Sequence, residues 1–139
     1  MPPGDNLYGP ILIGAWIDDE EFPVHPKGSQ PKRTLLCPSD PVLSGLIPEH
    51  RYIFKTAKVA WQSMQCWSEV IAYQIGSAIG LKLPPCYMAV DDSDGQNGVL
   101  MEFFYGYPAE AEPYRLMHAS DFLSRLIVDK RRGAPIAFA

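Results

Sequence analysis

Three segments of this sequence contain residues whose types suit the binding of phosphate groups. The segment HPKGSQPKRTLL carries Gly28 between two β-type stretches, and a glycine loop of this kind can bring backbone N–H groups close to phosphate oxygens. Lys55 ends the apolar segment RYIFK, and Glu69 follows fourteen residues later within a predicted helix. Together they could form a phosphate site in which the loop covers the phosphates, the lysine contacts them and the glutamate holds the lysine in place.

Each of these residues also has an ordinary structural explanation. A single glycine among prolines is typical of a turn, while strand-end lysines and helix glutamates are usually solvated. The three features therefore indicate a phosphate site through their order along the chain. If no phosphate binds there, Lys55 and Glu69 would form a structural salt bridge.

The elements that must position these residues are predicted to be short, since the chain contains 11 glycines and 14 prolines. A helix is predicted over 59–79, with Gly80 as its terminator and Pro84 and Pro85 beyond it. Two β-type runs then flank the hairpin signals Asp94-Gly95 and Asn97-Gly98. The predicted order is β–β–β–α–β–β–α, with strands over 7–17 (one or a pair), 33–37, 52–55, 86–90 and 98–105. This order favours an α+β fold, an antiparallel sheet with one main helix on it.

Helical periodicity defines the apolar face of the main predicted helix. Trp67, Ile71, Ile75 and Ala78 recur at helical spacing and are expected to face the sheet. Residues that widen this stripe are Cys66, Val70 and Tyr73. A last amphipathic helix is predicted over 121–128, capped by Ser120 and carrying Phe122, Leu123 and Leu126 inward.

In four segments the chain resembles the amino-terminal lobe of the HipA-like serine/threonine kinases. These segments are GSQPKRTLL (28–36), the strand that ends at Lys55, SEVIAYQIGSAIGLKLPP (68–85) and the hinge-like VLMEFFYG (99–106). The third is the most specific, because a glutamate, an apolar-small helix, then GL and a proline recur in this family. The resemblance covers 28–106 and implies a protein-kinase-like lobe.

The resemblance also implies roles for individual residues. Lys55 would be the lysine that contacts the ATP phosphates, with Glu69 as its ion-pair partner, and ATP would bring Mg²⁺ with it. The phosphate loop would contain Gly28, Ser29 and Gln30. Glu102 and Phe104 would contact the adenine edge through their backbone. The apolar walls of the pocket would include Ile53 and Met101, with Met101 gating its back.

Two departures from the family pattern limit these expectations. The positions before Gly28 read VHPK, with no hydroxyl residue of the kind that family members in toxin–antitoxin systems autophosphorylate. The residues after Gly106 contain Asp121 and Asp129 but no constellation that could orient an acceptor hydroxyl and hold Mg²⁺. We therefore expect a kinase lobe over 1–106, a linker and helical tail over 107–139, and no phosphoryl transfer unless a second lobe completes the site.

The leading hypothesis is thus a truncated or split kinase that binds ATP. The alternative is a non-enzymatic interaction module that keeps the lobe fold and binds a protein partner, such as an antitoxin-like component. A small-molecule hydrolase is disfavoured because the helix serines, Ser63, Ser68 and Ser77, have no histidine near them in sequence.

Composition excludes several other classes of protein. The 139 residues are 47% apolar and 20% charged, which suits one folded domain, and no apolar run approaches the ~18 residues of a membrane span. The net charge of −4 argues against a nucleic-acid binder that works through general electrostatics. The spacing of Cys37, Cys66 and Cys86 matches no zinc or redox motif. Without a predicted signal peptide, reduced thiols and a cytoplasmic location are expected.

Overall fold

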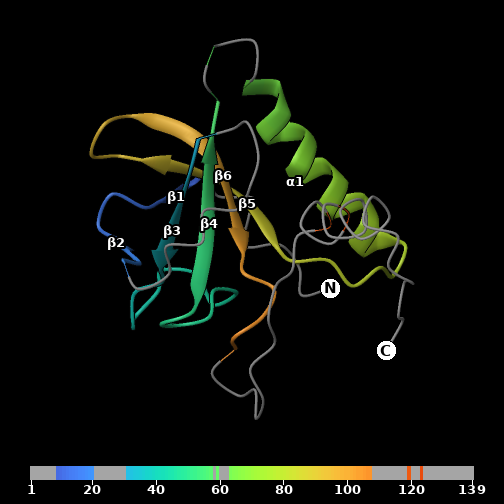
Figure 1. The fold of residues 1–139 in the computed structure, drawn as a ribbon, viewed down its shortest axis with the longest axis horizontal. Coiled ribbons are helices and arrows are strands. Elements are labelled where there is room, and N and C mark those ends of the chain that lie inside the picture. Colours follow the sequence, from blue (N-terminus) through green and yellow to red (C-terminus); the bar gives the residue numbers. More distant parts are fainter. Residues whose placement is uncertain are drawn as a thin grey trace, which may run out of the picture.

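The structure, a computed structural model, is an α+β fold with a six-stranded sheet and one helix beside it (Figure 1). It describes residues 9–20, 31–57, 59, 63–107, 119 and 123. The elements are β1 (Ile11–Leu12), β2 (Ile17–Asp18), β3 (Lys32–Leu36), β4 (Arg51–Thr56), α1 (Ser63–Ala78), β5 (Cys86–Asp91) and β6 (Gln96–Glu102). The predicted α+β class is confirmed. The predicted last helix, 121–128, lies outside the described residues apart from residue 123.

The sheet is mixed, which corrects the prediction of an antiparallel sheet. Its strand order is β1-β5-β6-β4-β3-β2, and four of the neighbouring pairs are antiparallel. The fifth pair is parallel, because β1 lies beside β5 with Ile11 opposite Ala89. The sequence predicted one strand or a strand pair over 7–17. The structure instead places β1 and β2 at opposite edges of the sheet, since the intervening turn separates them.

One face of the sheet carries the larger hydrophobic core. Side chains alternate between the two faces of a strand, and Tyr52 and Phe54 of β4 point to this face with Leu100 of β6. All three are almost completely buried. The other members of the core are Ile11, Ile13, Leu35, Cys37, Leu46 and Ala89, with Trp16, Leu43 and Tyr87 packed against them.

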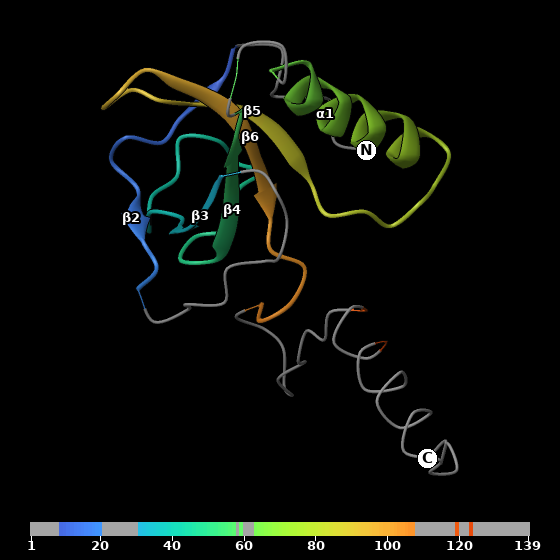
Figure 2. The same ribbon diagram turned by 45° about the horizontal axis from the view of Figure 1, so that its top comes forward.

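The other face is covered by α1, which runs along the side of the sheet next to β5 and β6 (Figures 1 and 2). The buried cluster between them is smaller. It contains Cys66 from α1, Cys86 from β5 and Val99 from β6, and Val70, Tyr73 and Met101 pack against it. The two faces of the sheet are thus filled unequally, with the main core on the face away from the helix.

The predicted apolar face of α1 is confirmed for the residues that widen it and wrong for the others. Trp67, Ile71 and Ile75 were expected to face the sheet, but they are 52%, 53% and 59% exposed, and Ala78 is exposed too. The helix contacts the sheet through the neighbouring stripe, which contains Cys66, Val70 and Tyr73. Both stripes are apolar, so periodicity alone does not select one of them. Glu69 lies on the second stripe, and this orientation brings it to Lys55.

Two of the turns that were predicted from glycine, at Gly80 and Gly95, are confirmed, while the third, at Asn97-Gly98, is not. Gly80 ends the helix with a φ of 82°, and the N–H of Leu81 bonds back to the carbonyl of Gly76, 2.9 Å away. Gly95 adopts a φ of 76° in the turn between β5 and β6, where its N–H donates to the carbonyl of Asp91 at 2.7 Å. Asn97 and Gly98, the second predicted hairpin signal, lie within β6 instead.

Candidate functional site

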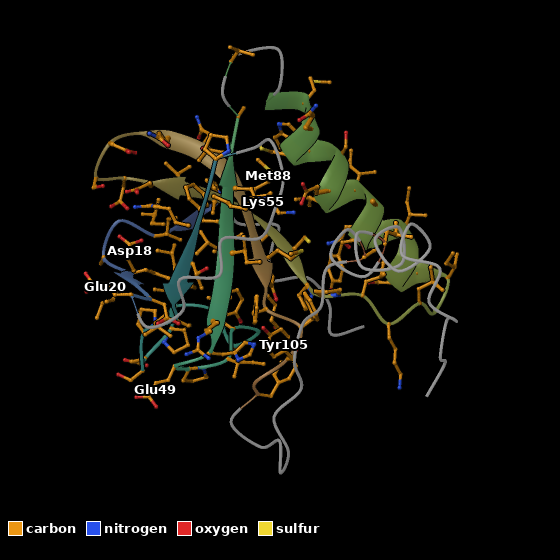
Figure 3. The ribbon with its side chains drawn as sticks, in the orientation of Figure 1. Asp18, Glu20, Glu49, Lys55, Met88 and Tyr105 are labelled. Carbon is orange, nitrogen blue, oxygen red and sulfur yellow. The ribbon has the colours of Figure 1, made fainter. Side chains whose placement is uncertain are left out.

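The centre of the candidate site is an ion pair between a strand and the helix that follows it. The ammonium group of Lys55, near the end of β4, donates a hydrogen bond of 2.8 Å to Oε2 of Glu69 on α1. The side chains are 19% and 30% exposed, respectively, so the pair is partly buried but open to solvent. Figure 3 shows Lys55 between β4 and α1. The predicted contact between these two residues is therefore present.

Packing around the pair fixes the helix against the strand. Cys66, one turn before Glu69, is buried between α1 and the sheet, and its thiol lies 4.0 Å from the carbonyl of Lys55. Val70 and Tyr73 pack on the same side of the helix. Gly76 lets Leu83 pack closely on the helix end, because a Cβ there would come within 2.2 Å of the Leu83 side chain and displace it. These contacts hold Glu69 next to Lys55.

A second lysine, which sequence reasoning did not single out, lies beside the pair. Lys32 of β3 is the register partner of Lys55, so the two side chains leave the same face of the sheet. Partial burial, and then the positive charge of Lys55, lower the pKa of Lys32, while Glu69 opposes this effect. The site therefore contains two ammonium groups and one carboxylate. Alternation along KRTLL places Lys32 on a strand, but the sequence gives no register that would bring it to Lys55.

The hinge-like segment lies at the other end of β4. Met101 is the register partner of Ile53, and both lie on the same face as Lys55. Glu102 is opposite Tyr52, three positions from Lys55, which is about 10 Å at the rise of a β-strand. A ribose and its phosphates can bridge that distance. The predicted walls, Ile53 and Met101, lie between the hinge and the ion pair, where Ile53 is buried and Met101 packs against the cluster under α1.

The backbone groups expected to contact adenine are not equally available. The N–H of Glu102 already donates to the carbonyl of Pro85 at 2.9 Å. The side chain of Glu102 is buried and accepts hydrogen bonds from the hydroxyls of Tyr52 and Tyr107, at 3.4 and 2.8 Å. Phe104, by contrast, is 44% exposed. The prediction for an adenine N–H donor therefore rests on Phe104.

A buried histidine, also missed in the sequence, positions this hinge-like segment. Nε2 of His50 donates to the carbonyl of Phe103 over 2.7 Å, and the N–H of Phe103 donates to the carbonyl of Arg51. The imidazole ring stacks on Tyr107 with a centroid distance of 4.4 Å. His50 is only 2% exposed. The chain after β6 is thus tied on both sides of Phe104, although no sequence motif marks His50 for this role.

The predicted phosphate loop lies outside the described residues. Gly28, Ser29 and Gln30 belong to the undescribed range 21–30, and Asp121 and Asp129 are outside as well. Pro31, the first described residue after the loop, accepts a hydrogen bond of 3.1 Å from the N–H of Thr56. The described chain therefore resumes after the loop beside the end of β4 that carries Lys55.

The cysteines and acidic residues provide no other reactive centre in the part of the chain that the structure describes. Cys37, Cys66 and Cys86 are buried and unpaired, and burial raises the pKa of Cys37 and of Cys86 to about 11. Their thiols thus stay protonated and unreactive at neutral pH. Among the described residues, no group of three or more His, Cys, Asp or Glu side chains could hold a metal ion. None of the described helices is long and apolar enough to span a bilayer.

Comparison of the chain with family models, with curated proteins and with solved structures gave no match.

Proposed function

We propose that this chain is a HipA-like kinase N-lobe that binds the phosphates of ATP through Lys55, with Glu69 holding the lysine in place. The observation that carries the proposal is the 2.8 Å contact between the two side chains. A lysine on a strand and a glutamate on the next helix is the arrangement that protein kinases use to position ATP.

The surroundings of the ion pair support the same function. The hinge-like segment begins within β6, which is the direct neighbour of β4. The exposed Phe104 lies just after the end of this strand. A nucleotide could therefore place its base at Phe104 and its phosphates at Lys55, with its sugar between them along β4. With Mg²⁺ bound to the phosphates, the chain would supply the clamping half of a phosphotransferase.

Catalysis requires more than this clamp. A carboxylate must orient the acceptor hydroxyl, and further side chains must hold Mg²⁺. The described residues contain no such constellation near Lys55. We propose that these groups come from a second lobe, whose acceptor specificity the present site does not determine.

The proposal is tested by thermal unfolding with and without Mg·ATP. A ligand that binds only the folded state at a hundredfold excess over its dissociation constant stabilises it by about 2.7 kcal/mol. We expect the melting temperature of the wild type to rise by several degrees and Lys55→Ala to abolish the rise. Lys82→Ala is the matched control, since Lys82 is exposed on the segment between α1 and β5. No rise at millimolar ATP would contradict the proposal.

A second candidate function, the binding of a protein partner without nucleotide, is favoured by the outer face of α1. Met64, Trp67, Ile71 and Ile75 are each more than half exposed on one helix and carry no charge. Contiguous apolar patches of this kind often mark interaction sites. If this function is the right one, Mg·ATP leaves the melting temperature unchanged. Ile71→Lys then weakens the self-association of the chain, measured by light scattering.

A further inference from the structure

The ion pair between Lys55 and Glu69 does not balance the charge at its end of the sheet. Lys32 and Lys55 face each other directly across β3 and β4, where opposed Cβ atoms lie about 4.5–5.5 Å apart. Like charges in directly opposed positions destabilise a sheet. Glu69 provides a single negative charge for two ammonium groups, so this cluster of three side chains carries one uncompensated positive charge.

Among the described residues, Lys32 has no ion-pair partner that explains its position. No carboxylate in this part of the chain lies within ion-pair distance of its ammonium group, whereas Arg33, Arg51 and Lys55 each have at least one. Lys32 is partly buried, and its pKa is lowered by this burial and by Lys55. The folded protein without ligand therefore holds Lys32 at an energetic cost. A ligand with several negative charges would remove that cost.

We propose that Lys32 and Lys55 form a two-lysine site for an oligophosphate chain, in which each ammonium group contacts a different phosphate. This proposal rests on the proposed function and specifies its ligand class: di- and triphosphates rather than monophosphates. Glu69 approaches Lys55 from α1, while Lys32 extends from β3. The phosphates would thus lie over β3 and β4, at the end of the sheet that carries Lys32 and Lys55.

The site requires lysines that act as mobile point charges. A lysine ammonium offers three donors without the fixed fork of arginine, so it can follow a flexible phosphate chain. Hydrogen bonds between charged partners are the strong class of hydrogen bond. Loss of Lys32 should therefore lower affinity for ligands that contact both lysines and spare ligands that contact only Lys55.

Calorimetric titration of adenosine, AMP, ADP, ATP and inorganic tripolyphosphate tests the proposal. We expect Lys32→Gln to weaken ATP, ADP and tripolyphosphate binding about tenfold or more, with AMP changed less than threefold. Lys32→Arg should retain part of the affinity, and Lys82→Gln is the matched control. Without ligand, Lys32→Gln should melt about 1–3 °C higher than the wild type. If Lys32 had a structural role, the Lys32→Gln variant would melt at a lower temperature than the wild type instead.

The outcomes separate this proposal from the function on which it rests. If the wild type binds ATP and Lys32→Gln binds it equally well, the two-lysine site is wrong and the ATP clamp stands. If tripolyphosphate binds through Lys32 but adenosine adds no affinity in ATP, the phosphate site stands and the nucleotide function fails. If neither ATP nor tripolyphosphate binds the wild type, both proposals fail.

Discussion

The two faces of the sheet each carry an ion pair that joins two segments of the chain, and the two pairs differ in how completely their charges are compensated. On the core face, Arg33 of β3 pairs with Asp91 of β5. Asp91 is only 3% exposed and also accepts hydrogen bonds from the N–H and the hydroxyl of Ser93. The guanidinium lies 5.6 Å from the ring centre of Phe54. Both charged groups of this pair thus have interaction partners within the protein.

On the helix face, both side chains of the pair between Lys55 and Glu69 are partly exposed, whereas Asp91 is buried, and Lys32 is an unbalanced neighbour. An ion pair alone therefore does not mark a functional site. A satisfied pair such as Arg33–Asp91 contributes to stability. A partly open pair with excess charge of one sign is suited to bind a charged ligand.

The largest effect is expected from the satisfied pair. Asp91→Ala removes the acceptor for Arg33 and for both groups of Ser93, so the free energy of unfolding should fall by about 2–3 kcal/mol in urea denaturation. The folded protein should still respond to Mg·ATP, because Asp91 lies on the opposite face from Lys55. Asp40→Ala is the control, since Asp40 is exposed, and should stay within about 0.5 kcal/mol. A loss at Asp91 no greater than at Asp40 would contradict this interpretation.

A smaller effect is expected when the two pairs are compared by double-mutant cycles. The coupling free energy between Arg33 and Asp91 should be about 1–2 kcal/mol, because Asp91 is buried. That between Lys55 and Glu69 should be about 0.5 kcal/mol, since Glu69 is partly exposed and solvent screens its charge. Thermal or urea unfolding of Arg33→Met, Asp91→Asn, Lys55→Met, Glu69→Gln and the two double variants gives both values. Equal couplings would remove the distinction between a stabilising pair and a binding pair.

The core-face pair should also appear in the pH dependence of stability. The Ser93 hydroxyl, and further the Ser93 N–H and Arg33, hold the pKa of Asp91 below its ordinary value, although burial acts in the opposite direction. A carboxyl with a lowered pKa in the folded state contributes stability above its unfolded pKa and loses it as the pH falls. We therefore expect unfolding free energy to decrease below about pH 4. The unfolding free energy of Asp91→Asn should decrease less steeply over the same pH range. A decrease parallel to that of the wild type would contradict the assignment.

The sequence predicted the pairing of Lys55 with Glu69 because both residues lie in strongly patterned elements, a strand and the helix that follows it. It did not predict Lys32 as part of the site, because register is a property of the folded sheet, and a shift of one residue would turn Lys32 to the other face. The parallel pairing of β1 was missed for a related reason. With two residues, β1 has too little pattern to reveal its partner. His50 was missed because its contact with Phe103 depends on tertiary packing alone.

The apolar face of α1 was predicted correctly only in part, for a physical reason that gives the smallest of the expected effects. Two adjacent stripes of α1 are apolar, and the stripe with the larger side chains faces outward. Val70→Ala, on the inner stripe, should cost about 1 kcal/mol of unfolding free energy. Ile71→Ala, one residue further and 53% exposed, should change it by less than about 0.5 kcal/mol, since alanine is also the better helix former.

Urea denaturation at two protein concentrations checks this last comparison. In the monomer, the order of the two losses reports directly which stripe contacts the sheet. A cost at Ile71 that exceeds the cost at Val70 and grows with protein concentration would mean that the outer stripe is covered by a second copy in solution. That result would overturn the expected order and favour the interaction module over the ATP clamp, because the apolar face of α1 would then hold the functional contact.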